Sequence, residues 1–74
     1  MQSDFYVKLG KNIKAQRKKL GMTQQQLADK MDISLNFMGK IEVAFSKPSL
    51  DTLIDFAAAL DTTVSDLTKF DNEN

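Results

Sequence analysis

The fold is decided by the stretch Thr23-Gln24-Gln25-Gln26-Leu27-Ala28-Asp29-Lys30-Met31-Asp32-Ile33-Ser34. Thr23 and Gln26 have the spacing of a capping box, in which each side chain bonds the other residue's backbone N–H, so a helix begins here. Asp32-Ile33 forms a short turn that ends this helix, and Ser34 is a favourable N-cap for the next one. Two short helices joined by such a turn have the spacing of a helix-turn-helix motif.

Helix signals continue on both sides of this stretch. Before it, apolar side chains recur at helical spacing, Ser3 or Asp4 can cap the start, and Gly21 stands where a left-handed terminator belongs. After it, Pro48 ends a loop and Ser49 caps a further helix. The expected helices are about Asp4–Leu20, Thr23–Met31, Leu35–Ala44, Ser49–Leu60 and a short one opened by Thr63.

Five short helices with connections of a few residues predict an all-α, compact five-helix bundle. We expect one domain over residues 1–74, with its core at about residues 9–68 and a frayed acidic tail at 71–74. The expected buried side chains are Leu9, Ile13, Leu20, Leu27, Ala28, Met31, Ile33, Met38, Ile41, Leu50, Leu53, Ile54, Ala57, Leu60, Val64 and Leu67.

The composition of the 74 residues argues against several classes of function. There is no cysteine and no histidine, which removes disulfides, thiol nucleophiles, the commonest general base and the usual ligands of structural zinc. The longest apolar run, Phe56–Leu60, is too short to span a bilayer, and no secretory signal is visible. Asp51 and Asp55 could in principle hold Mg²⁺, but acidic residues at this spacing are more often solvated. We therefore expect a cytoplasmic binding protein without a cofactor or metal, and not an enzyme.

The formal net charge of zero hides an asymmetry along the chain. Residues 1–48 hold nine basic and four acidic side chains, whereas residues 49–74 hold one basic and six acidic ones. A basic first part favours contact with a polyanion such as double-stranded DNA. Random variation of charge over a small surface is the alternative explanation.

A combination of short motifs extends through most of the chain. It consists of residues 10–24, Leu27-Ala28, Ile33-Ser34, Ile41-Glu42 and Lys47–Leu53, and it covers about residues 9–68. This combination resembles the lambda-repressor-like, or Xre-type, helix-turn-helix proteins, which include Cro repressors and restriction–modification controller proteins. The resemblance implies a five-helix domain that binds a (pseudo)palindromic operator, usually as a homodimer, and regulates transcription.

The outward face of the motif's second helix carries the residues that we expect to read bases. Asparagine can bond adenine through two atoms, lysine can reach O6 and N7 of guanine, and an apolar side chain can contact the methyl group of thymine. A partly buried position is an equal alternative for Phe37, and Asn36 could instead be merely solvated. The base-reading candidates are Leu35, Asn36, Phe37, Gly39 and Lys40, with Gly39 allowing close approach of the backbone to DNA.

Polar residues around the motif are expected to contact the DNA backbone. Gln24 begins a helix, whose N-terminus favours phosphate, and the resemblance implies that its side chain clamps the backbone. Any single lysine is more often solvated than bound, but as a group these residues flank the motif. The phosphate-binding candidates are Thr23, Gln24, Lys11, Lys14, Ser46, Lys47 and Ser49, together with Lys18 and Lys19.

Two further features concern assembly. The resemblance implies an ion pair between Arg17 and Glu42 that ties the first helix to the recognition helix. A homodimer is expected because one recognition helix reads too few base pairs for a unique site. We expect its interface near the acidic C-terminal part, at Phe56, Ala58 and Phe70, although both phenylalanines could instead close the core of a monomer.

The chain departs from the family pattern at several positions. Glycine is common in the family in the motif's turn and after the third and fourth helices, where this chain has Asp32, Ala44 and Asp61. Aspartate tolerates left-handed backbone moderately well, and alanine less so. Phe45 stands where a basic residue is usual, which weakens one expected phosphate contact and can leave an aromatic side chain exposed.

A protein-interaction module is the alternative function. The same fold occurs in antitoxins and in regulators that act by binding another protein. The chain also has more aromatic residues than its core needs, and some of them could form an interface. These residues are Phe5, Tyr6, Phe45, Phe56 and Phe70.

Overall fold

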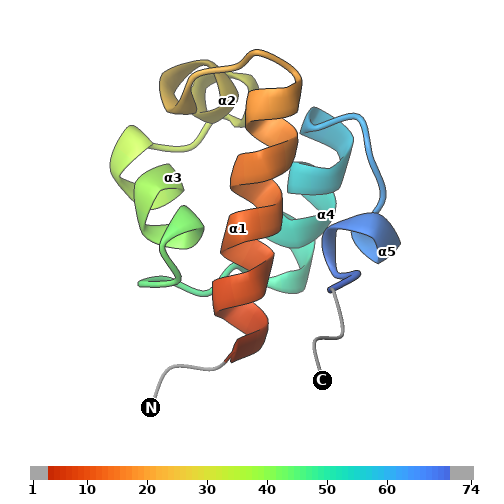
Figure 1. Ribbon diagram of the computed structural model, residues 1–74. Coiled ribbons are helices and arrows are strands. Elements are labelled where there is room, and N and C mark those ends of the chain that lie inside the picture. The colour runs from red at the N-terminus through yellow and green to blue at the C-terminus, as the bar shows by residue number, and fades with distance from the viewer. Residues whose placement is uncertain (1–3, 71–74) are drawn as a thin grey trace.

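Residues 4–70 are described by a computed structural model, in which they form five α-helices joined by short turns. Figure 1 shows α1 running through the middle of the molecule, with α3 on one side of it and α4 and α5 on the other. The predicted all-α, five-helix architecture is therefore confirmed. Ser3 and the tail at 71–74 lie outside the described residues. The helices are α1 (Asp4–Lys19), α2 (Gln24–Met31), α3 (Leu35–Glu42), α4 (Leu50–Ala59) and α5 (Val64–Leu67).

Side-chain caps fix where four of the helices begin. Thr23 Oγ1 accepts the N–H of Gln26 at 3.0 Å, and Gln26 Oε1 accepts the N–H of Thr23 at 2.8 Å, so the predicted capping box is present. Ser34, Ser49 and Thr63 cap α3, α4 and α5, each accepting an N–H from the first turn. These bonds satisfy the backbone N–H groups that have no partner within the first turn of a helix. Because the capping residues are close in sequence to the groups they bond, the sequence predicts the helix starts well.

Left-handed residues follow the ends of the first four helices. Gly21, with φ 72°, follows α1 as predicted. The other left-handed residues are Asp32 at 58°, Ala44 at 63° and Asp61 at 59°. α3 therefore ends at Glu42, before the expected Ala44, because Ala44 itself adopts the conformation that closes the turn. A left-handed residue that carries a Cβ is strained by about 1–2 kcal/mol.

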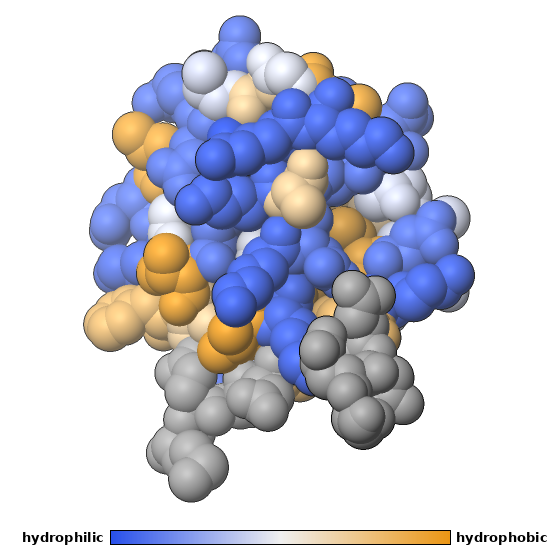
Figure 2. Space-filling model, viewed as in Figure 1, coloured by the Kyte–Doolittle hydropathy of each residue, from blue (hydrophilic) through white to orange (hydrophobic). Residues whose placement is uncertain are grey.

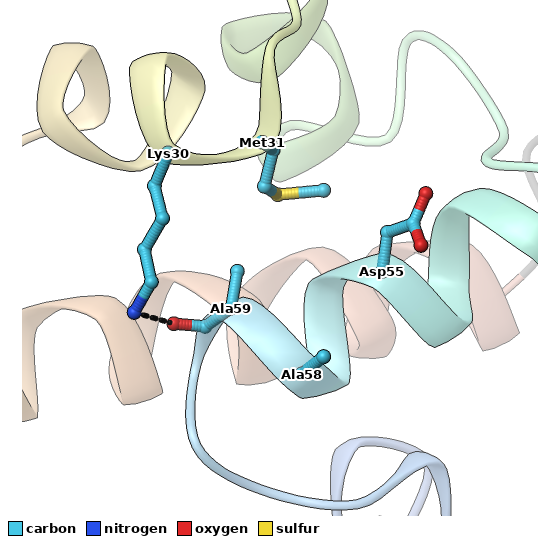
Figure 3. A pocket seen from close by; sticks show the side chains of 5 residues that line it. All are labelled: Lys30, Met31, Asp55, Ala58 and Ala59. Atoms are coloured by element: carbon cyan, nitrogen blue, oxygen red, sulfur yellow. Dashed lines mark hydrogen bonds between the residues drawn. The ribbon is translucent and has the colours of Figure 1, made fainter.

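Polar side chains bond carbonyl groups at the ends of α4 and α5. On α1, Asn12 Nδ2 donates to the carbonyl of Leu67 at 2.9 Å, and Gln16 Nε2 donates to the carbonyl that follows α4 at 3.0 Å. On α2, Lys30 Nζ donates to the carbonyl of Ala59 at 2.8 Å (Figure 3). These bonds satisfy acceptors that helix ends leave without a partner, and they hold the last two helices on the first two.

One hydrophobic core draws side chains from every helix. Met31, Ile33 and Val64 pack against it and are partly buried. α1 packs against α3 and α5, while α2 packs against α3 and α4, so the first two helices together hold the other three. The buried cluster consists of Leu9, Ile13, Leu27, Ala28, Met38, Ile41, Leu53, Phe56, Ala57, Ala59, Leu60 and Leu67.

Three residues expected in the core are exposed instead. Leu50 is 68% exposed, Ile54 49% and Leu20 42%. Phe56, by contrast, has no exposed surface. The buried stripe of α4 starts at Leu53 and follows the i, i+3, i+4, i+7 spacing, which includes Phe56 and leaves Leu50 and Ile54 to one side. Leu20 lies beyond the last turn of α1, where the chain turns away from the core.

Gly10 is the point where α1 comes very close to α3. A Cβ at Gly10 would lie 2.5 Å from the carbonyl oxygen of Glu42 and 2.8 Å from that of Ile41. Both are backbone atoms, which cannot rotate away as the end of a side chain can. The lack of a side chain at Gly10 therefore sets the distance between these two helices.

Gly10→Ala should lower the free energy of unfolding by about 1–3 kcal/mol, because the added methyl group pushes α1 away from α3. Urea unfolding followed by circular dichroism measures this change. Gly39→Ala is the matched control, because the nearest heavy atom outside its own helix is Gln24 Oε1 at 4.0 Å. This variant should gain up to about 1 kcal/mol from helix propensity. Similar stability of the two variants would contradict the close contact.

Candidate nucleic-acid interface

An ion pair between α1 and α3 lies at the centre of the helix-turn-helix. Arg17 Nε donates to Glu42 Oε2 at 2.6 Å, and Arg17 Nη2 donates to Glu42 Oε1 at 3.0 Å. Both residues are buried, so each charge has lost its hydration and is stabilised by the opposite charge of its partner. The hydrogen bond to Glu42 raises the pKa of the Arg17 guanidinium, against the opposing effect of burial. The predicted Arg17–Glu42 pair is present.

The same carboxylate holds the start of α2. Gln24 Nε2 donates to Glu42 Oε1 at 2.9 Å, and Arg17 Nη1 donates to the carbonyl of Met22 at 2.8 Å. Arg17 and Glu42 thus connect α1, α3, the first residue of α2 and the turn before it. A glutamine amide has two N–H donors, so Gln24 can bond Glu42 with one and still offer the other to a phosphate.

α2 and α3 pack through buried apolar side chains and a tight turn. Ala28 of α2 is fully buried, and Met38 and Ile41 form the inward face of α3. Ile33 in the turn is partly buried, and its N–H donates to the carbonyl of Ala28 at 3.0 Å. This packing occupies the back of α3 and directs its opposite face outward.

The outward face of α3 carries most of the base-reading candidates. Leu35 and Asn36 are exposed in the first turn of the helix. Gly39 and Lys40 are half-buried further along it. Phe37 is partly buried and packs against the core, which agrees with the alternative considered for this residue. Leu35, Asn36 and Lys40 are therefore the side chains best able to reach outward.

Three of the lysines exposed on α1 lie near its contact with α3. Lys14 is one turn after Gly10 and one turn before Arg17, the two residues through which α1 meets α3, so it lies along the same edge. Lys11 lies one turn before Lys14 and Lys18 one turn after it, and all three side chains are exposed. Figure 2 shows a largely hydrophilic surface over this part of the molecule. These lysines give this side of α1 a positive charge.

The remaining phosphate-binding candidates lie at two helix starts and in one turn. Thr23 and Ser49 use their hydroxyl oxygens to cap α2 and α4. Ser46 and Lys47 belong to the turn between α3 and α4, and the Ser46 N–H donates to the Lys40 carbonyl at 3.1 Å. Lys47 Nζ lies 5.3 Å from the centre of the Tyr6 ring, which orients it beside α1.

The candidates for a dimer interface occupy different environments. Phe56 has no exposed surface, so its predicted place in an interface is wrong: the ring fills the core, as the monomer alternative had it. Phe70 is partly buried and packs edge-to-face on Phe5, with ring centres 5.3 Å apart. Ala58 is exposed at a shallow hollow between α2 and α4 (Figure 3). The hollow is lined by Lys30, Met31, Asp55, Ala58 and Ala59.

Sequence reasoning missed one contact on the outward face of α3. Lys40 Nζ lies 5.5 Å from the centre of the Phe45 ring. Phe45 is 76% exposed, which confirms that an aromatic side chain stands free of the core here. The signal in the sequence is the aromatic residue itself, three residues after the end of α3.

Two properties of residues 4–70 bear on other kinds of function. None of their helices combines the length and apolar character that a membrane crossing requires. Within the same residues, no three acidic, cysteine or histidine side chains gather so that they could hold a metal ion. Asp51 and Asp55 are both exposed on α4, as solvated acidic residues are.

Comparison with known proteins agrees with this geometry. The family model described as helix-turn-helix matches residues 13–67, well over half of the chain. The chain belongs to the lambda-repressor-like helix-turn-helix family. Its members are transcriptional regulators, in agreement with the expectation that the chain is not an enzyme.

Two phage repressors are similar to this helix-turn-helix protein in sequence. The immunity repressor protein of Bacillus phage phi105 is 44% identical over 57 residues, which are 77% of this chain and 40% of the repressor. The cryptic phage CTXphi transcriptional repressor RstR of Vibrio cholerae is 33% identical over 61 residues, 82% of this chain and 54% of the repressor. The chain thus spans about half the length of these relatives.

Two solved structures are similar to it in both fold and sequence. The restriction-modification controller protein C.AhdI from Aeromonas hydrophila has a TM-score of 0.80 and 27% identity, over 84% of this chain and 94% of that one. The biofilm master regulator SinR, solved in complex with DNA, has a TM-score of 0.77 and 31% identity, over 82% of this chain and 98% of that one.

Arg17→Met should lower the free energy of unfolding by about 3–5 kcal/mol, because it leaves the Glu42 carboxylate buried without its cation. The double variant Arg17→Met/Glu42→Leu removes both charges and should recover most of that loss. Urea unfolding of the three proteins gives the comparison. If the double variant were no more stable than Arg17→Met, the unpaired charge would not be the cause.

Proposed function

We propose that this helix-turn-helix protein binds a pseudo-palindromic operator in double-stranded DNA as a homodimer and regulates transcription. The observation that carries the proposal is the orientation of α3, in which Glu42 is bonded by Arg17 and Gln24 while Asn36 and Lys40 are directed outward. A helix fixed at its back and polar at its front can enter a major groove. The similarity to two phage repressors favours repression over activation.

The chemistry of the outward face suits direct reading of bases. Asn36 can donate to and accept from the edge of an adenine, and Lys40 can donate to O6 and N7 of a guanine. Leu35, 44% exposed, can contact the methyl group of a thymine. Gly39 has no side chain between them, so the helix backbone can approach the floor of the groove.

Residues around α3 supply contacts to phosphates that do not depend on sequence. Gln24 lies at the N-terminus of α2, where the helix dipole favours an anion, and its bond to Glu42 fixes its direction. Lys14 and Lys47 flank α3 on the α1 side and beyond its end, and both are exposed. The similarity to SinR, which was solved in complex with DNA, supports DNA binding by this chain. An operator-binding role also accounts for the expected cytoplasmic location.

A homodimer supplies the second recognition helix that a pseudo-palindrome requires, with half-sites about 34–36 Å apart or a multiple of this. Leu50, Ile54 and Ala58 are spaced by one turn each on α4 and all are exposed, so they form an apolar stripe. We assign the dimer contact to this stripe, which retains Ala58 from the expected interface and replaces the buried Phe56. We also propose that the partly buried Phe70 contacts the second copy of the chain in this dimer.

Asn36→Ala should weaken binding to the preferred operator by about 1–3 kcal/mol and relax the preference at one base pair. The preferred site is first obtained by selection from random duplex DNA, and affinities are then measured by gel shift. Lys14→Ala is the comparison, because Lys14 is exposed on α1 and loss of a phosphate contact should weaken preferred and random DNA to the same extent.

A uniform effect of Asn36→Ala on all sequences would contradict its role as a base reader. Selection that returned no preferred sequence at all would overturn the proposed function. The protein-interaction alternative would then account for the exposed apolar residues.

Ile54→Lys should convert the dimer to a folded monomer, because a symmetric contact buries this side chain twice. Ile54 is 49% exposed in the single chain, so its burial contributes about half of the value for a fully exposed isoleucine, about 0.75–1.5 kcal/mol for each copy. Loss of this contribution in both copies weakens dimerisation at least about tenfold. Sedimentation equilibrium at micromolar concentration measures the state of the chain. Ala15→Lys, at an exposed position of α1, is the control and should leave the dimer intact. An unmodified chain that is monomeric, or an Ile54→Lys variant that still dimerises, would refute the assigned surface.

A further inference from the structure

Phe45 is an aromatic residue that the fold does not need in its core. It is 76% exposed, while the core of the molecule is filled by other side chains. A side chain so exposed contributes little to the hydrophobic stabilisation of the fold. It follows the end of α3 by three residues, and its ring lies near the ammonium group of Lys40 on that helix.

The backbone holds Phe45 in a fixed relation to Lys40. The Phe45 N–H donates to the Lys40 carbonyl at 2.7 Å, and the Ser46 N–H donates to the same oxygen at 3.1 Å. Ala44, in the left-handed conformation, closes the turn between them. These bonds fold the chain back on the last turn of α3, so the ring of Phe45 lies alongside the side chain of Lys40.

The ring and the ammonium group are within range of a cation–π interaction. Lys40 Nζ lies 5.5 Å from the centre of the Phe45 ring, and attraction of this kind extends to about 6 Å. A lysine side chain has many rotamers and loses much of this freedom when it binds DNA. A ring that already restricts the ammonium group reduces the entropy lost on binding.

We propose that Phe45 is a positioning residue for Lys40, which it holds ready to donate to O6 and N7 of a guanine in the major groove. The proposal rests on the proposed operator binding, because Lys40 must lie at the DNA interface. It assigns the aromatic residue a role in base discrimination.

The experiment compares Phe45→Leu and Phe45→Tyr on the operator obtained by selection. Lys40→Met first identifies the base pair that the lysine reads, because this change keeps an unbranched apolar stem and removes the ammonium group. Phe45→Leu should then lower affinity for the operator about two- to fivefold and reduce discrimination at that same base pair. Phe45→Tyr keeps the π face and should retain both. In the Lys40→Met background, Phe45→Leu should have no further effect on that base pair.

Val43→Ala is the matched control, since Val43 is an apolar side chain of the same turn and is 74% exposed. It should leave discrimination unchanged. The NMR shifts of the Lys40 side-chain protons give a readout without DNA: the ring current of Phe45 should displace them upfield, and Phe45→Leu should abolish this displacement.

The outcomes separate this proposal from the proposed function. If the unmodified chain shows no sequence preference, operator binding is refuted and so is the role of Phe45. Sequence preference that is unaffected by Lys40→Met or by Phe45→Leu would overturn the role of Phe45 alone. The same holds if Val43→Ala reproduces the effect, if Phe45→Leu acts equally without Lys40, or if the Lys40 protons show no ring-current shift.

Discussion

The carboxylate of Glu42 is the group on which the arrangement of the first three helices depends. It is buried, so it must be bonded on several sides, and its partners come from α1 and from the first residue of α2. A buried charge of this kind specifies geometry, because a shift of any of these helices would remove at least one of its hydrogen-bond partners. The direction in which α3 presents its outer face is thereby coupled to the position of α1. Gly10 adds a steric limit two turns before Arg17 on α1, where the helix meets the backbone carbonyls of Ile41 and Glu42.

Local signals explain why so much of the fold follows from sequence. Caps such as Thr23 and Ser34 act within one turn of the chain, so their effect is legible without tertiary information. The helix-turn-helix and the Arg17–Glu42 pair were also predictable, the first from spacing and the second from family resemblance. In the candidate site, the sequence therefore predicts the helices that support α3 and the residues on the outward face of α3.

Features that depend on contacts between distant residues were not predictable in the same way. α4 has apolar residues on most of its circumference, so its sequence allows either of two faces to be buried. Only packing against the other helices decides that Phe56 is buried and Ile54 is exposed. The closeness of Gly10 to α3 needs the crossing of two helices, which a single glycine does not reveal. The Lys40–Phe45 contact depends in turn on the left-handed Ala44, which shortens α3.

The left-handed turns at Asp32, Ala44 and Asp61 have a consequence for how the chain can evolve. Glycine at such a position relieves native strain but enlarges the unfolded ensemble, so the two effects partly cancel in stability. They do not cancel in stiffness, because a Cβ narrows the range of angles that the backbone explores around the turn. Asp32 lies in the turn that joins α2 to α3. Asp32→Gly would therefore make this turn more flexible and change the free energy of unfolding only a little. Selection on stability alone would therefore overlook a change that loosens the turn between α2 and α3.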